Sequence, residues 1–354
     1  MQYRRQDVYN KKEPFYHFRY SPLIALIMVP FAFIEYPAYG LATWFVILNA
    51  AMLAALFFFV RNITADIMVD KATKYMILWG AFFVSLRFYL MNISIGQSDV
   101  LAAMLFALFL ACYAGNKEIL CGLILALVLQ FKPAFLPMLF YFLLIGKRAL
   151  VISAIFGFAA LLFAPAAAIG LDKTVVLIRS WADILGMSIP SQLLCYKNQS
   201  ITYFIGKSLL DIGFIKSSIS ADRLFFTLGA ALTTASFAAL ILFRRSLKAA
   251  EDKKFKYLEV ALLIIITLLF SPIMWVAQFV NLMIPAGITI LFLSKSRNKK
   301  PALIACAGFV AFSIVAGTDL TNFLPAIDRM NFINIAIGTV FLTYALVYSY
   351  RRSL

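Results

Sequence analysis

The sequence has little charge and a single histidine. Charged residues make up 14% of its 354 residues, whereas 63% are hydrophobic and the mean hydropathy is +0.91. A soluble domain is about half apolar and about a quarter charged, so water is not the solvent of this chain. A GxxxxGK[ST] phosphate loop, a paired-histidine metal site and a GxSxG elbow are all missing. We therefore expect no ATP-driven, zinc-dependent or serine-hydrolase activity, no metal and no cofactor.

The sequence also lacks the strict alternation of polar and apolar residues that a membrane barrel requires. Its apolar residues form long blocks instead, such as 41–60, 150–168 and 224–243. At about 1.5 Å per residue, each block approaches or reaches the roughly 30 Å thickness of a hydrocarbon core. This pattern predicts an all-α polytopic membrane protein with about ten or eleven transmembrane helices, forming one integral domain over 1–354.

Basic residues outnumber acidic ones by 32 to 16 and give a net charge of +16. They stand in short runs between apolar blocks, without the interleaved aromatic residues or folded basic face that binds nucleic acid, so we expect no nucleic-acid partner. We interpret the runs as topology signals on the cytoplasmic side of a plasma membrane, with the C-terminus inside. These runs are Lys147-Arg148, 244–256, 295–300 and Arg351-Arg352.

Following the helices along the chain from these inside positions places four polar features on the outer side. We therefore predict an outward active face, with 171–221 as an outer region that carries an amphipathic helix at 172–187. The stretches 118–131 and 133–146 predict short or broken helices that meet on the same side. The four features are Gln97 with Asp99, Lys132, the run 198–200, and the run 271–278 with Trp275 and Gln278.

Three charged residues are candidates for chemistry, each with a simpler structural alternative. Arg87 is expected near mid-membrane on a helix at 75–93, where it faces either a polar cavity or a structural partner. Lys132 precedes a proline in a largely apolar run, where it holds an anionic headgroup or reaches headgroups nonspecifically. Asp99 opens a helix at 98–115, and its carboxylate is either functional or an ordinary cap.

Five short motifs, in order along most of the chain, resemble glycosyltransferase family 87. The resemblance implies a C-type glycosyltransferase fold, a polyprenyl-phosphate sugar donor, commonly mannose, and a lipid or glycan acceptor on the outer face among membrane lipids. The motifs are Tyr20-Ser21-Pro22, Gly96-Gln97-x-Asp99, Lys132-Pro133, Asn198-Gln199-Ser200 and Ser271-Pro272-x-x-Trp275.

The chemistry that this resemblance implies needs a proton acceptor, cations for the departing phosphate and polar groups that orient the sugar. Arg87 and Lys132, with Arg19 as a third, are the candidates for the phosphate. Trp275 is expected to stack on a sugar or to belong to an aromatic belt, and Gln278 stands near the place of a family histidine. The residues expected to orient sugar hydroxyls are Gln97, Asp99, Asn198 and Gln199.

The N-terminal segment departs from the family pattern. In the family, a first helix and an acidic outer loop precede the Tyr-x-Pro segment, whereas here the polar segment 1–21 stands in their place. Asp7 is the only aspartate before Tyr20, and it lies too close to be equated with the usual catalytic residue. The catalytic residue is therefore unassigned, with Asp7 and Asp99 as candidates.

Two alternatives to an active transferase remain at this stage. A transporter or lipid flippase would suit an arginine at mid-membrane, but the predicted helices lack the acidic residues that couple ion movement to transport. A catalytically inactive relative would fit the missing helix and acid. Transfer of a labelled sugar from polyprenyl phosphate by the purified protein would distinguish an active transferase from both alternatives.

Overall fold

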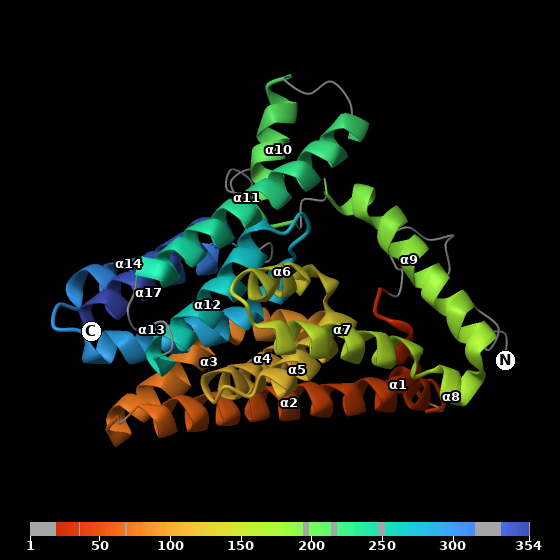
Figure 1. Ribbon diagram of the computed structural model, residues 1–354, viewed down its shortest axis with the longest axis horizontal. Coiled ribbons are helices and arrows are strands. Elements are labelled where there is room, and N and C mark those ends of the chain that lie inside the picture. Colours follow the sequence, from red (N-terminus) through yellow and green to blue (C-terminus); the bar gives the residue numbers. More distant parts are fainter. Residues whose placement is uncertain are drawn as a thin grey trace.

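The computed structural model describes residues 19–34, 36–67, 69–193, 198–213, 218–246, 252–315 and 334–353. These residues form helices joined by short turns, and the isolated bridge between Asn198 and Trp275 is the only β pairing among them (Figure 1). The predicted all-α fold class is confirmed. The candidate Asp7 lies outside the described residues.

The helices follow the apolar blocks of the sequence. They are α1 (Pro22–Ala32), α2 (Pro37–Asp66), α3 (Lys71–Ile95), α4 (Asp99–Ala114), α5 (Glu118–Phe131), the 3₁₀ helix η2 (Pro133–Phe135), α6 (Pro137–Leu144), α7 (Arg148–Phe163), α8 (Ala166–Ile169), α9 (Leu171–Leu193), α10 (Ile201–Asp211), α11 (Ser218–Ser246), α12 (Lys253–Phe270), the 3₁₀ helix η3 (Val276–Leu282), α13 (Met283–Lys295), α14 (Lys300–Val315) and α17 (Asn334–Ser353).

Five helical spans of the described chain are long and apolar enough to cross a membrane, and five further apolar helices have 10–17 residues. The protein is therefore a polytopic membrane protein, while the total of ten or eleven crossings stays a prediction. The five long spans are Ala38–Asp66, Lys71–Ile95, Arg148–Ile169, Leu224–Ser246 and Val276–Lys295.

The apolar runs of the sequence also predict single helices over 149–170 and 272–294, and the structure differs from both predictions. The stretch 272–294 is not one helix, because the chain is extended at Trp275 and continues as η3 before α13 begins. The stretch 149–170 is interrupted between α7 and α8 at Pro165, which has no N–H to continue the hydrogen-bond ladder. The amphipathic helix expected at 172–187 extends as α9 to Leu193.

Helices α12 and α13 form the centre of the bundle. Every residue of α12 from Phe255 to Leu269 is buried, and 89% of the most apolar window of Val276–Lys295 is buried inside the protein. Large apolar side chains on the outer helices are exposed instead, including Leu53 and Phe57 on α2 and Phe83 on α3. Apolar residues therefore cover both the inside and the outside of the bundle, as a hydrocarbon environment requires.

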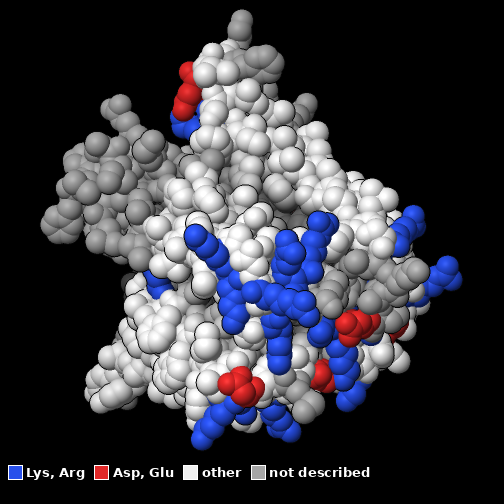
Figure 2. All heavy atoms as spheres, turned by 90° about the vertical axis from the view of Figure 1, so that its left-hand side faces the viewer, with Lys and Arg blue, Asp and Glu red and all other residues white. Residues whose placement is uncertain are grey.

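The basic runs gather at one end of the bundle, which Figure 2 shows face-on. Contacts tie the helix ends together there: Lys253 with Asp66, Lys256 with Asn116, Lys147 with Glu118, and Arg351 over the ring of Phe243. We call this the basic end. Helices α3, α4, α5 and α12 each have one terminus at this end, so their other termini bring 96–99, Lys132 and Ser271 to the opposite end of the bundle.

A buried carboxylate joins four helices near the basic end. Glu259 on α12 is fully buried and accepts hydrogen bonds from Tyr113 on α4, Tyr141 on α6 and Arg244 on α11, whose Nη1 lies 2.7 and 2.9 Å from its two oxygens. Glu259 is thus an acidic residue within a buried helix of the bundle. Its oxygens are committed to these partners, which indicates a structural role.

Replacing Glu259 by alanine is expected to destabilise the protein strongly. The change leaves the Arg244 guanidinium and two tyrosine hydroxyls without their acceptor, and breaking a buried ion pair costs on the order of 3 to 5 kcal/mol. Thermal unfolding of the purified protein in detergent measures the loss. The control is Asp211→Ala, which breaks the exposed Lys207–Asp211 pair and should leave the melting temperature nearly unchanged. Equal melting temperatures for the two variants would contradict the structural role of Glu259.

Candidate functional site

An ion pair between Lys132 and Asp99 lies at the end of the bundle opposite the basic end. The Lys132 Nζ atom is 2.8 Å from Asp99 Oδ1, and the two side chains are only 11% and 1% exposed. Lys132 ends α5 because Pro133, which has no N–H, follows it and restricts its backbone to an extended conformation. Asp99 is the first residue of α4, where the helix dipole favours a negative charge.

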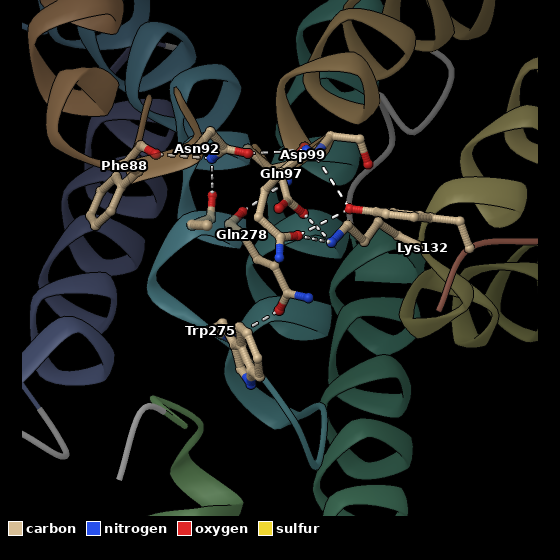
Figure 3. A network of polar contacts seen from close by, with 11 residues as sticks. Phe88, Asn92, Gln97, Asp99, Lys132, Trp275 and Gln278 are labelled. Carbon is tan, nitrogen blue, oxygen red and sulfur yellow. Dashed lines mark hydrogen bonds and ion pairs between the residues drawn. The ribbon is translucent and has the colours of Figure 1, made fainter. Parts of the chain in front are cut away.

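Gln97 and Tyr20 also contact the Lys132 ammonium group, and Figure 3 shows Gln97 beside Lys132 and Asp99. The Gln97 Oε1 atom accepts from Lys132 Nζ at 3.4 Å and from the Tyr20 hydroxyl at 3.1 Å. The Lys132 Nζ atom also lies 5.6 Å from the centroid of the Tyr20 ring, within the range of a cation–π contact. Three segments distant in sequence therefore meet at one cation.

The electrostatics of this group keep Lys132 charged. Lys132 stands between the apolar helices α5 and α6 rather than within either. Its burial works to lower the pKa, but the attraction of the Asp99 carboxylate, with help from Tyr20, outweighs burial and raises the pKa of Lys132 above its usual value. The Asp99 carboxylate thus favours the charged form of this largely buried ammonium.

Asn92 is a part of this site that the sequence analysis missed. It is fully buried on α3, and its Nδ2 donates to the carbonyls of Phe88 at 2.9 Å and Ala277 at 2.7 Å, while its Oδ1 accepts from the Asp99 backbone N–H at 3.1 Å (Figure 3). One amide thereby links α3, α4 and η3. The sequence does contain one indication of this role, because Asn92 is a polar residue one turn before the end of the apolar helix α3.

The turn between α3 and α4 depends on Gly96. Its φ of 65° lies in the left-handed region, which glycine adopts without steric cost, and its carbonyl accepts from Trp44 Nε1 at 3.1 Å. This turn sets Gln97 and Asp99 beside Lys132.

A second polar group joins the run 198–200 to the loop before η3. The Asn198 side chain donates to the Pro272 carbonyl at 2.7 Å and accepts from the Met274 backbone at 3.0 Å, while the Gln199 backbone N–H donates to the Met274 carbonyl at 2.7 Å. The amide of Asn198 therefore holds the loop in place. The Gln199 Oε1 atom is buried and makes no hydrogen bond with the described residues.

Trp275 lies at the end of this loop. The Arg19 guanidinium carbon is 5.5 Å from the centroid of the Trp275 ring, and the Arg19 carbonyl accepts from Trp181 Nε1 on α9 at 2.9 Å. The buried Nε1 of Trp275 has no hydrogen-bond partner among the described residues. Gln278 uses its Oε1 atom to accept from the Trp275 backbone N–H at 3.0 Å, so that its amide caps the start of η3.

Arg87 has a partner of another kind. Its Nη1 atom donates to the backbone carbonyl of Ser313, in the last turn of α14. A cation is favourable at a helix C-terminus, where carbonyl groups lack helical partners. This contact fits the structural-partner alternative for Arg87, whereas Lys132 lies beside Gln97 and Asp99.

The described residues thus form an all-α membrane protein that holds a cation among amides and aromatic rings at one end of its bundle. The sequence model of glycosyltransferase family 87 matches residues 18–272, nearly three quarters of the chain. The chain belongs to this family and is a membrane glycosyltransferase. No curated protein and no solved structure matched the chain. The matched range contains every candidate site residue except Asp7, Trp275 and Gln278.

Substituting Asn92 by leucine is expected to loosen this end of the bundle. The Asp99 N–H and the Ala277 carbonyl would each lose a buried partner, and an unsatisfied buried group costs about 1 to 3 kcal/mol. A lower melting temperature in detergent checks the effect, with Ser94→Ala on the exposed side of α3 as the control. A leucine variant as stable as the control would contradict the linking role of Asn92.

Proposed function

We propose that the protein transfers a hexose, with mannose as the first sugar to test, from a polyprenyl-phosphate donor to a lipid or glycan acceptor. The observation that carries the proposal is the buried Lys132 ammonium. Lys132 lies at the break between the apolar helices α5 and α6. A polyprenyl chain is apolar and can lie against such helices, while its phosphate requires a cation near their ends. Both needs of the donor are met at this one place.

The Lys132 ammonium has the capacity to bind one more anion. An ammonium group has three N–H donors, and Asp99 and Gln97 accept two of them. The third is available to a phosphate oxygen. When the bond between the anomeric carbon and the phosphate oxygen breaks, the phosphate gains negative charge, which a fixed cation in a dehydrated site stabilises. Arg19 lies near enough to Lys132 for the two cations to interact electrostatically, and it would add to the positive potential at the phosphate.

The acceptor hydroxyl must lose its proton as it attacks the anomeric carbon. Asp99 is committed to the Lys132 ammonium, and its carboxylate is almost completely buried. We therefore assign Asp99 the role of holding Lys132 in position. The catalytic base stays unassigned, and Asp7 keeps its place as a candidate outside the described residues.

The loop around Trp275 is proposed to contact the sugar. Gln199 Oε1 and Trp275 Nε1 supply a hydrogen-bond acceptor and a donor that are not used within the described structure. Sugar hydroxyls both donate and accept, so this pair suits them. Arg19 lies over one face of the Trp275 ring, and we propose that the sugar stacks on the other face. Asn198 contributes by fixing the loop rather than by touching the donor.

The proposed orientation follows from the separation of the two ends. Lysine and arginine concentrate in cytoplasmic loops of membrane proteins. The basic end would then face the cytoplasm, together with the C-terminus, and the Lys132 site would face outward from the plasma membrane.

Replacing Lys132 by methionine, which keeps the length of the side chain, is expected to lower the transfer rate about 10² to 10³-fold, since it removes charge stabilisation from the transition state. Gln97→Ala removes a single hydrogen-bond acceptor and should cost about tenfold. The assay follows radiolabelled mannose from polyprenyl-phosphate mannose to extracted lipid and glycan with the purified protein in liposomes.

The control for this assay is Lys299→Met, an exposed lysine at the basic end that should leave transfer unchanged. Full activity in Lys132→Met would exclude the site. Binding of the donor by the unaltered protein without any transfer, together with movement of the donor across the liposome membrane, would favour a flippase instead.

The orientation is tested by labelling single cysteines in a cysteine-free background. Asp211→Cys on α10, the helix that follows the Gln199 run, should react in intact cells with a maleimide that cannot cross membranes. Arg297→Cys at the basic end should react only after the cells are permeabilised. The reverse pattern of labelling would overturn the proposed orientation.

A further inference from the structure

A groove on the outside of the bundle lies where α5 and α7 begin at the basic end. It has a volume of about 590 Å³ and is open to the surroundings of the protein. The side chains that line it on the lipid-facing side are apolar and exposed, with Ile119 at 64%, Leu120 at 44% and Leu123 at 43%. Its size lies within the range of about 300 to 1,000 Å³ found for small-molecule sites.

The two helices that line the groove, α5 and α7, are in unusually close contact. A Cβ atom on Gly122 would lie 2.3 Å from the Leu150 carbonyl and 2.8 Å from the Ala154 nitrogen, so only glycine permits this approach. Where the two backbones pack closely, the large side chains of Ile119, Leu120 and Leu123 point away from the contact and are exposed. Ala149 on α7 has a small side chain, which leaves room at the mouth of the groove. The groove is therefore fixed by rigid helices.

Positive charge surrounds the mouth of the groove. Lys117 lines it, and the exposed Arg148 directly precedes the lining residue Ala149. The one acidic residue there, Glu118, is paired with Lys147 at 3.0 Å and so cancels the charge of that lysine only. Lys117 and Arg148 are left as two cations at the level where the apolar helices α5 and α7 start.

We propose that this groove binds an anionic phospholipid of the leaflet at the basic end. An acyl chain would lie against the exposed apolar side chains, and the headgroup phosphate would lie between Lys117 and Arg148. Basic pockets between transmembrane helices bind anionic headgroups, and each lysine or arginine near the surface adds to the attraction. The site lies at the opposite end of α5 from Lys132, so its occupant is distinct from the sugar donor.

The experiment measures lipid binding to the full chain by native mass spectrometry. Purified protein in detergent is incubated with equal amounts of phosphatidylglycerol and phosphatidylcholine, and the bound lipids are counted. We expect the unaltered protein to prefer phosphatidylglycerol, and the double variant Lys117→Gln/Arg148→Gln to lose about tenfold of that preference. A matched control, Lys299→Gln/Lys300→Gln, removes two exposed charges from the same end and should keep the preference.

A second variant tests the apolar part of the groove without changing its charge. Ala149→Phe should fill the mouth and lower the binding of both lipids, and its melting temperature shows that it has folded. Two results would overturn the proposal: an equal loss in both double variants, which means general charge attraction, or an unchanged preference in Lys117→Gln/Arg148→Gln. Normal lipid binding by folded Ala149→Phe would overturn it as well.

Discussion

Hydrocarbon offers no hydrogen-bond partners, and this constraint governs where the polar residues of the chain lie. Glu259 is buried and has three partners, Arg87 donates to the end of α14, and Asn92 uses its side-chain amide on three backbone groups. Many exposed lysines and arginines gather at the basic end (Figure 2). Against this background, Gln199 Oε1 and Trp275 Nε1 stand out in the loop before η3, because they are buried without a hydrogen-bond partner among the described residues.

Much of the fold could be predicted because helices in lipid need long apolar runs. The bounds of α5 were predicted at 118–131, and the proline after Lys132 indicated the break between α5 and α6. The helix predicted to start at 272 begins at Val276 instead, after an extended Trp275. Proline is common in the first turn of a helix, so Pro272 did not distinguish a helix start from an extended segment. An apolar run therefore predicts that a segment is buried more reliably than it predicts whether the segment is helical or extended.

The site could be predicted only in part, because its contacts join residues far apart in sequence. Short motifs indicated Gln97, Asp99 and Lys132 by their spacing and polarity. The pairing of Glu259 with Tyr113 spans 146 positions, and that of Arg87 with Ser313 spans 226. A single sequence carries no sign of such pairings, since each partner is an ordinary residue within its own helix. The role of Asn198 in orienting sugar stays a prediction, and its hydrogen bond to the Pro272 carbonyl, 74 positions away, is another contact that the sequence did not indicate.

The pairing of Lys132 with Asp99 has a consequence for how the protein is made. A newly inserted chain meets the bilayer before it meets any substrate, and a lone cation in a dehydrated cleft would strain the bundle at that time. Because Asp99 balances the charge of Lys132 within the protein itself, this ion pair can form as soon as α4 and α5 pack together. Insertion and packing of the bundle then do not depend on a substrate to neutralise the buried ammonium.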